Sequence, residues 1–219
     1  MKRLSSRRTK IWHKDYLVYK YLWPNLTSSI NSVLTTINSK KPVVLDIGCG
    51  EKPYKDMFGN CQYVGVNYSQ DGASPEIVGD ALNLPIKSAS VDIVLCSQVI
   101  EHVPDPKKLI KESYRVLKSG GGLILTGPFY WPLHEEPYDF YRFTYYGFEY
   151  LLKHIGYKSI DIKADGNDWI QIMVSVNLRM PNYLFPIRVF LNTLGLFLGH
   201  ISNQVKSPLN YTATCYKLT

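Results

Sequence analysis

Short apolar runs alternate with amphipathic segments along most of the chain, which is typical of an α/β protein. Three segments have helical spacing, at 54–58, 105–118 and 145–156, and the last of these ends at a glycine. Seven runs are short, apolar or alternating and therefore predict strands, at 43–48, 62–67, 76–80, 91–97, 121–128, 157–165 and 210–218. This order predicts a seven-stranded, mostly parallel sheet with helices on both faces.

Two regions depart from the alternation. Apolar positions at mixed helical spacing over 15–40 predict two short helices, interrupted at Pro24 and ending near Ser39. Residues 167–207 are strongly apolar and predict a helical insertion before the last strand. The chain therefore divides into an N-terminal basic tail with helices (1–40), a main α/β domain (41–166 and 208–219) and the apolar helical insertion (167–207).

The insertion contains the run LFPIRVFLNTLGLFLGHI at 184–201. Only about a dozen apolar-leaning residues follow its proline and arginine, whereas a membrane span needs about 20, so we expect no span. Small or polar residues form one stripe at helical spacing: Arg188, Asn192, Gly195 and Gly199. Three interpretations stay open for this segment: packing on its own protein, packing on a second copy as a homodimer, or peripheral contact with a membrane surface.

The charge of the chain is concentrated at its start. The 219 residues carry a net charge of +7, and residues 1–20 contain seven basic residues against one acidic residue. The rest is close to neutral, so no nucleic-acid partner is expected, and the basic end is a solvated terminus or a contact for anionic lipid. Four scattered cysteines form neither a disulfide framework nor a zinc motif, which favours a reducing, cytoplasmic location.

The first strand runs into a glycine turn with unusual neighbours. The sequence VVLDIGCGEKPY has two glycines, but Pro53 stands where a dinucleotide loop has its third. Asp46 and Glu51 flank the turn, and carboxylates there would repel a pyrophosphate. They favour a cationic ligand instead, such as an ammonium or a sulfonium. A phosphate-binding P-loop is excluded because no Gly-Lys-Ser/Thr follows.

Five motifs in order resemble the class I S-adenosylmethionine (SAM)-dependent methyltransferases: LDIGCG, QYVGVN, GDALNLPI, VDIVLCSQVIEHVPDP and RVLKSGGGLILTGP. The resemblance covers roughly residues 40–165 and the final strand, and it implies a Rossmann-like sheet with SAM as cofactor. Asp80 would accept from the adenine amino group, and Ser97 and Gln98 would lie beside the methionyl end. The complete implied cofactor set is Asp46, Gly48, Cys49, Gly50, Asn67, Tyr68, Asp80, Ala81, Ser97 and Gln98.

One cofactor position departs from the family pattern. Asn67 lies at the interval after Asp46 where the family usually has an acid that holds the ribose hydroxyls. An amide can still accept from one hydroxyl and donate to the other. It loses the charge-assisted part of that bond, so we expect cofactor binding weaker by about 1 kcal/mol. This position is the local support for an alternative in which the fold is a non-catalytic SAM-binding scaffold.

The loop after the fifth predicted strand, PFYWPLHEEPYDFYRFT, is rich in aromatic and acidic residues. It is similar to loops of subfamily members associated with glycan and polysaccharide biosynthesis, which implies a small-molecule or glycan acceptor. We hypothesise that His134 is the general base of an O-methylation, oriented by Glu135 or Glu136, with Arg142 in the same site. The alternative is that His134, Asp139 and Arg142 form a polar brace for the loop.

The remaining expectations concern metals and other substrates. No metal is expected, because no carboxylate cluster is evident apart from the glutamate pair. Glu101 and His102 are assigned to packing and hydrogen bonding at a helix start, with contact between His102 and the pocket left open as the alternative. A second enzymatic interpretation is a membrane-associated methyltransferase of the lipid or quinone type, which the apolar segment would bring to its substrate. Modification of nucleic acid is disfavoured, because the fourth strand ends in CSQV and lacks the Asn/Asp-Pro-Pro-aromatic run of base-amino methyltransferases.

Overall fold

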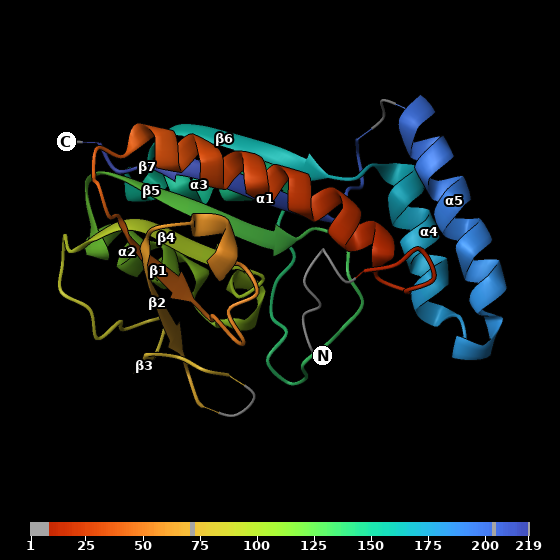
Figure 1. The fold of residues 1–219 in the computed structure, drawn as a ribbon, viewed down its shortest axis with the longest axis horizontal. Helices are drawn as coiled ribbons and strands as arrows, with labels where there is room; N and C mark the ends of the chain where they lie inside the picture. The colour runs from red at the N-terminus through yellow and green to blue at the C-terminus, as the bar shows by residue number, and fades with distance from the viewer. Residues whose placement is uncertain (1–8, 71–72, 203–204, 219) are drawn as a thin grey trace.

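The structure is a computed structural model that describes residues 9–70, 73–202 and 205–218. It contains one seven-stranded sheet in the order β3-β2-β1-β4-β5-β7-β6 (Figure 1). Every neighbouring pair is parallel except those made by β7, which runs antiparallel to β5 and β6. The strands are β1 (Val43–Ile47), β2 (Gln62–Asn67), β3 (Ile77–Val78), β4 (Val91–Ser97), β5 (Leu117–Pro128), β6 (Lys158–Asp165) and β7 (Asn210–Tyr216). The predicted seven-stranded, mostly parallel α/β fold is confirmed.

Successive side chains of each strand point to opposite sides of the sheet, so both faces carry apolar side chains, and helices cover both. On one face, α1 (Tyr16–Thr36) and the short helix η2 (Lys55–Phe58) pack against alternate residues of β1, β4 and β5. On the other face lie α2 (Pro106–Val116) and α3 (Tyr145–Ile155). Helix α3 ends at Gly156, which has a left-handed backbone, as the sequence predicts.

Helix α1 is continuous through Pro24, so the predicted interruption is wrong. A proline in a helix interior removes one hydrogen bond and costs about 3 kcal/mol. Here the apolar face of the helix offsets that cost, because Leu26, Ile30 and Val33 are buried against the sheet. Leu17, in the first turn of the helix, is buried in a separate cluster with α4 and α5. Packing at both ends thus holds a helix that local propensity would break.

The insertion forms two helices, α4 (Asp168–Arg179) and α5 (Phe185–Ile201), joined by the short helix η4 (Asn182–Leu184). They extend beyond one end of the sheet, next to the start of α1 (Figure 1). By length and composition alone, residues 182–201 are long and apolar enough to cross a membrane, and 17% of the apolar window is buried. The expectation that this segment is too short to span is therefore wrong, although one such helix is weak evidence for a span.

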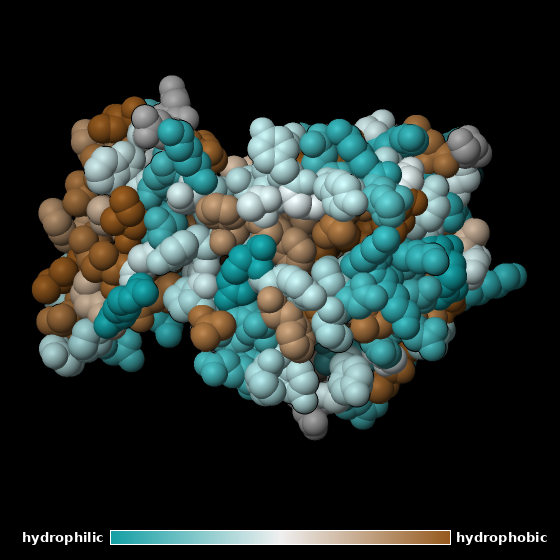
Figure 2. Space-filling model, turned by 180° about the vertical axis from the view of Figure 1, so that it is seen from behind, coloured by the Kyte–Doolittle hydropathy of each residue, from teal (hydrophilic) through white to brown (hydrophobic). Residues whose placement is uncertain are grey.

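Helix α5 buries its polar stripe and exposes its apolar face. Asn192 is fully buried; its carbonyl accepts from Asn177 at 2.8 Å, and its amide donates to the main-chain carbonyl of Ile11. Arg188 is also buried and donates to the carbonyl of Met180. The outward stripe consists of exposed apolar side chains, Phe190, Phe197 and Ile201. Figure 2 shows hydrophobic side chains gathered at the end of the molecule that α4 and α5 form.

Candidate functional site

The predicted glycine loop lies at the carboxyl end of β1, where the strand order reverses between β2 and β4. Open α/β sheets bind ligands at such a point. The loop is fixed by the amides of Gly48 and Cys49, which both donate to the carbonyl of Val66 on β2. Gly48 and Gly50 have φ of 70° and 51°, a region that favours glycine. A Cβ at Gly48 would lie 2.3 Å from a methyl of Val99, so only glycine fits there.

The two carboxylates that flank this turn differ in environment. Asp46 is buried and accepts a 2.6 Å hydrogen bond from the hydroxyl of Tyr63, whereas Glu51 is exposed. Burial, with the neighbouring Asp46, raises the pKa of Tyr63, which therefore stays a donor. Cys49 is buried as well, and burial raises the pKa of its thiol to about 11. Asp46 is thus a buried carboxylate that links the end of β1 to Tyr63 of β2.

Other predicted cofactor residues follow along the same edge of the sheet. Asn67, at the end of β2, donates to the carbonyl of Ser69 at 2.8 Å. Asp80, just after β3, accepts from the amide of Leu82 and is exposed. Ala81 is half-buried beside it, and Tyr68 is 81% exposed. These positions lie around the carboxyl ends of β2 and β3, and their part in a nucleoside site stays a prediction.

A pocket opens at the carboxyl end of β4. Ser97 is buried and bonded to the hydroxyls of Tyr54 and Thr126, while Gln98 donates to Thr126 and lines the pocket. The pocket brings together residues from α1, the segment before η2, the end of β4, the loop after β5 and the start of β7. Its lining consists of Asp15, Val18, Tyr19, Leu22, Tyr54, Gln98, Glu101, His102, Trp131, His134, Glu135 and Asn210. Sequence reasoning found Gln98, His134 and Glu135 in this set.

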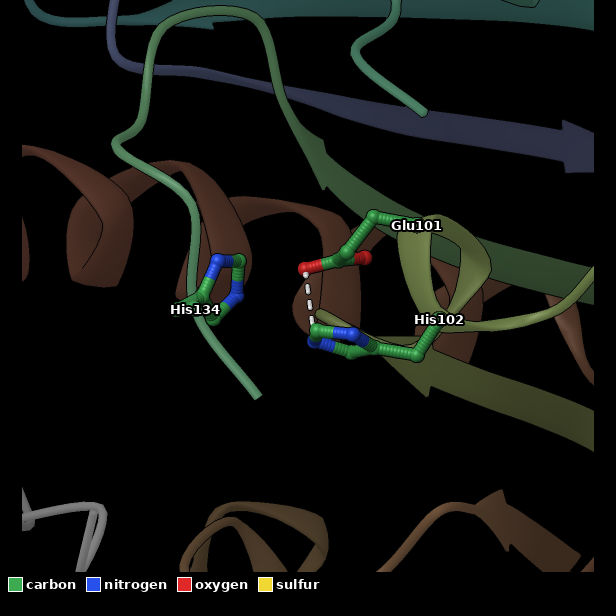
Figure 3. A group of neighbouring side chains, drawn as sticks. All are labelled: Glu101, His102 and His134. Atoms are coloured by element: carbon green, nitrogen blue, oxygen red, sulfur yellow. Dashed lines mark ion pairs between the residues drawn. The ribbon is translucent and has the colours of Figure 1, made fainter. Parts of the chain in front are cut away.

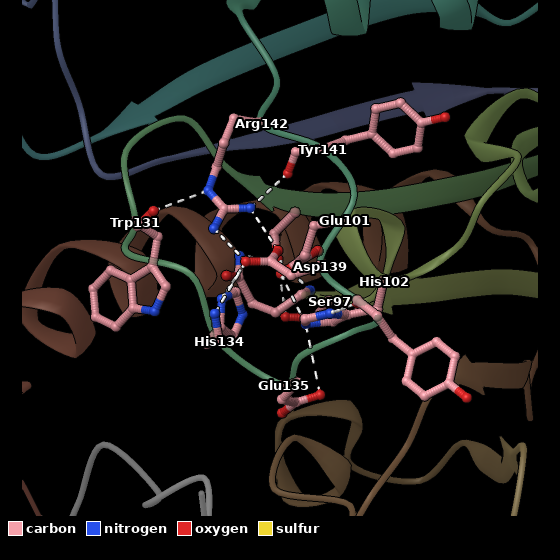
Figure 4. A network of polar contacts seen from close by, with 12 residues as sticks. Ser97, Glu101, His102, Trp131, His134, Glu135, Asp139, Tyr141 and Arg142 are labelled. Atoms are coloured by element: carbon pink, nitrogen blue, oxygen red, sulfur yellow. Dashed lines mark hydrogen bonds and ion pairs between the residues drawn. The ribbon is translucent and has the colours of Figure 1, made fainter.

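Arg142 lies behind the pocket and is not among its lining residues. Its guanidinium makes a two-pronged contact with Asp139, at 2.6 and 2.7 Å, and donates to the carbonyls of Trp131, Pro132 and Tyr141 (Figure 4). Hydrogen bonding to Arg142 lowers the pKa of Asp139 to about 2. The brace that the sequence left open as an alternative is therefore present, and Arg142 holds the loop in place.

The brace also orients His134. Asp139 accepts from the main-chain amide of His134, and its carboxylate lies 3.2 Å from Nδ1 of the ring. The carbonyl of Pro132 lies at 3.2 Å from the same nitrogen. Two acceptors at Nδ1 place the ring proton there and leave the lone pair on Nε2. Burial lowers the pKa of His134, so the neutral ring prevails at neutral pH.

Glu101 and His102 complete a group that the sequence assigned to packing. They belong to the short helix η3 (Ile100–His102), directly after β4, and their side chains point toward His134 across the pocket (Figure 3). One carboxylate oxygen of the fully buried Glu101 lies 3.8 Å from Nε2 of His102. The rings of His102 and His134 meet edge to face with centroids 4.7 Å apart. Their position at the carboxyl end of β4 was the available signal in the sequence.

The other predicted catalytic residue, Glu136, is exposed and does not line the pocket, whereas Glu135 does. One oxygen of Glu135 lies 3.7 Å from Nε2 of His102. The structure thus brings His134 and Glu135 together with Gln98 and the Glu101–His102 pair. Glu136 and Arg142 lie outside the lining of that pocket.

Known proteins resemble the chain in this same region. The family described as "Methyltransferase domain" matches residues 45–125. A 2-methyl-6-phytyl-1,4-hydroquinone methyltransferase of Arabidopsis thaliana is 31% identical over 61% of this chain and 41% of its own length. A tRNA (carboxymethyluridine(34)-5-O)-methyltransferase of the same plant is 28% identical over 52% of this chain and 29% of its own. The chain thus spans less than half the length of these two relatives.

Among solved structures, a SAM-dependent methyltransferase from Archaeoglobus fulgidus has the same fold. It superposes with a TM-score of 0.59 and 15% identity, covering 91% of this chain and 97% of its own. The family match contains the glycine loop, Asn67, Asp80 and Gln98, which are the residues that the structure places along one edge of the sheet. Residues 45–125 therefore match a methyltransferase domain, the fold is that of solved SAM-dependent methyltransferases, and the cofactor of such domains is S-adenosylmethionine.

Proposed function

We propose that this protein transfers a methyl group from SAM to a hydroxyl oxygen of a small-molecule or glycan acceptor, with His134 as general base. The observation that carries the proposal is the position of His134. Its Nδ1 is held by Asp139, and its ring lines the pocket that Gln98 borders at the end of β4. Gln98, which is predicted to lie beside the methionyl end, and the predicted base therefore share one pocket.

The residues present fit SAM. Gly48 and Gly50 keep the loop backbone open, and Asn67 and Asp80 place polar groups beyond β2 and β3, where the ribose and adenine would lie. When bound, SAM supplies a methyl group on a positively charged sulfur. The pocket holds the acceptor oxygen in line with that methyl group and limits the access of water, which is the main contribution of a protein to such a displacement.

The proton follows a defined route. As the acceptor oxygen forms its bond to the methyl carbon, the carbon–sulfur bond breaks and its electron pair stays on sulfur. The hydroxyl proton moves to Nε2 of His134, and Asp139 stabilises the resulting imidazolium through Nδ1. Aromatic side chains in the pocket lining, such as Trp131, offer a face to a sugar ring or another flat acceptor.

A screen of labelled methyl transfer identifies the acceptor class, using nucleotide sugars, glycan fragments, quinone precursors and tRNA. We then compare His134→Ala with Leu133→Ala, an exposed neighbour outside the pocket lining. We expect the first variant to lose about a hundredfold in kcat with SAM affinity unchanged, and the second to keep full activity. A loss of less than threefold in a folded His134→Ala protein would show that the base assignment is wrong.

Calorimetry with SAM separates the enzyme from the scaffold alternative. Binding at micromolar concentrations together with transfer to any of the tested acceptors supports the enzyme. No binding at about a millimolar would support a scaffold that has lost its cofactor. Labelling of tRNA alone would overturn the expectation that nucleic acid is not the partner.

We also propose that the α4–α5 end contacts a membrane surface, which suits an apolar acceptor. The observation behind it is the inverted polarity of α5, which buries Arg188 and Asn192 and exposes Phe190 and Phe197. Helices that face lipid have this arrangement, with polar and small residues toward the protein and apolar residues toward the outside. The basic segment at 1–20 adds attraction to anionic headgroups, although residues 1–8 lie outside the described residues.

Vesicle sedimentation tests this contact, with one lipid mixture containing anionic headgroups and one without. We expect the double substitution Phe190→Ser and Phe197→Ser to reduce binding at least tenfold. The matched control is Tyr146→Ser with Tyr150→Ser, two exposed aromatic residues on α3. A lipid-free homodimer that the phenylalanine substitutions dissociate, with no vesicle binding by the wild type, would assign this face to a second copy instead.

A further inference from the structure

We infer that Glu101, His102 and His134 form a binding site for a divalent metal ion at the acceptor pocket. Their ligand atoms all lie within 4.8 Å of one another, although the residues come from η3 and from the loop after β5. All three side chains line the same pocket, and they face one another (Figure 3). Two imidazoles with one carboxylate suit a divalent transition ion such as Zn²⁺, Mn²⁺, Fe²⁺ or Co²⁺.

The orientation of each imidazole is the stronger evidence. Nδ1 of His102 lies 2.7 Å from the carbonyl of Tyr138, and Nδ1 of His134 lies 3.2 Å from the carboxylate of Asp139. An acceptor at Nδ1 fixes the proton there, so each ring presents the lone pair of Nε2. Metal-bound histidines almost always have such a partner on the other ring nitrogen. In this structure both rings already have such a partner at Nδ1.

The separations are close to those that an ion requires. Ligands about 2.1 Å from a four-coordinate ion lie roughly 3.4 Å apart. The distance between Glu101 and Nε2 of His102 is already 3.8 Å, so small side-chain rotations complete this pair. Glu135 has an oxygen 3.7 Å from the same Nε2 and can supply a fourth ligand. Its side chain is 61% exposed, so it can move aside for an acceptor oxygen.

Charge also favours a cation at this point. Glu101 is fully buried and one oxygen of Glu135 lies 3.7 Å from Nε2 of His102, so two carboxylates would attract a cation placed between them. Arg142 is paired with Asp139 and does not line the pocket.

The binding site does not depend on the proposed function. The role of the ion rests on the proposed methyl transfer to a hydroxyl, and it replaces His134 as the group that activates that hydroxyl. With an ion bound, Nε2 of His134 is a ligand and cannot accept a proton. The acceptor hydroxyl would then coordinate the ion, which lowers its pKa, and would release its proton to solvent water. The resulting oxygen attacks the methyl carbon as before, and the carbon–sulfur electron pair stays on sulfur.

The test of binding needs neither SAM nor an acceptor, so its outcome is independent of methyl transfer. The full chain, without a purification tag, is titrated with Co²⁺ and followed by visible absorption, and Zn²⁺ then competes. We expect one ion per chain at micromolar or tighter affinity, with absorption bands typical of four or five nitrogen and oxygen ligands. No saturable binding of Co²⁺, Zn²⁺ or Mn²⁺ up to about a millimolar would overturn the site.

Variants assign the ion to these residues. His102→Gln and His134→Ala should each weaken Co²⁺ binding at least tenfold, and Asp139→Asn should weaken it about tenfold by replacing the charged acceptor near Nδ1 with a neutral amide. His154→Ala, an exposed histidine on α3, is the control and should bind as the wild type does. Equal binding in the His102 and His134 variants would place the ion elsewhere and refute the assignment.

A measurement on the wild type covers the case in which a variant fails to fold. Mn²⁺ should broaden the ring-proton NMR signals of His102 and His134 and leave that of His154 sharp. Activity with and without a chelator then tests the role. Methyl transfer that survives complete removal of the ion would refute the role in catalysis and would favour His134 as the base.

Discussion

Gly48 offers a quantitative test of how tightly the cofactor loop is built. The substitution Gly48→Ala introduces two separate costs. The backbone φ of 70° belongs to the left-handed region, where an L-residue costs about 1–2 kcal/mol. The new Cβ would also lie 2.3 Å from Cγ2 of Val99, whereas carbon atoms normally approach to about 3.5–4.0 Å. Val99 must therefore move by about 1 Å or more, and such overpacking costs about 1–3 kcal/mol.

The same loop contains a matched control in Gly50. Its φ is 51°, but nothing lies within 4 Å of the Cβ that Gly50→Ala would add. That variant has the conformational cost alone, so it should lose about 1–2 kcal/mol of unfolding free energy. Gly48→Ala should lose about 2–5 kcal/mol. The assay is urea denaturation of each variant, with SAM affinity measured by calorimetry on the folded protein.

A third variant separates the two costs of Gly48→Ala. Adding Val99→Ala removes the methyl groups in the way, so the double variant should recover about 1–3 kcal/mol relative to the sum of the single variants. If both glycine variants lose the same free energy and the double variant shows no coupling, the clash with Val99 is not the reason for glycine at position 48.

Three further substitutions test other parts of the structure. Burial raises the pKa of Asp165 to about 7, although its hydrogen bonds act in the opposite direction, so the folded protein favours the protonated carboxyl. The free energy of unfolding should therefore fall by about 2–3 kcal/mol between pH 5 and pH 8. In Asp165→Asn this fall should disappear from denaturation curves measured at both pH values. Asn67→Asp should tighten SAM binding about fivefold in calorimetry, and an unchanged affinity would contradict the assignment of this position to the ribose. Asn192→Leu leaves the carbonyl of Ile11 and the amide of Asn177 without their buried partner. It should therefore lower the free energy of unfolding in urea by at least about 2 kcal/mol. Thr193→Leu, on the exposed side of α5, should change that free energy little.

The sheet and its cofactor loop could be predicted from the sequence, because they depend on short-range patterns. Each buried strand is a short run of apolar residues, and each helix that follows has its own start and stop signals. Thr144 caps α3 through the amide of Gly147, and Gly156 ends it with a left-handed backbone. The glycines after β1 mark a turn that other residues cannot form. Such features are local, so they can be recognised before the chain is folded.

Long-range contacts decided the rest. Helix α1 continues through Pro24 because burial of its apolar face outweighs a local penalty, which the sequence pattern alone does not show. Arg142 turns away from the pocket because Asp139 and three main-chain carbonyls satisfy it there. His102 and His134 are far apart in the sequence and meet only because the ends of β4 and β5 are neighbours in the sheet. The sequence determined the fold and the cofactor, whose signals lie within short segments, while the tertiary structure decided which side chains share the acceptor pocket.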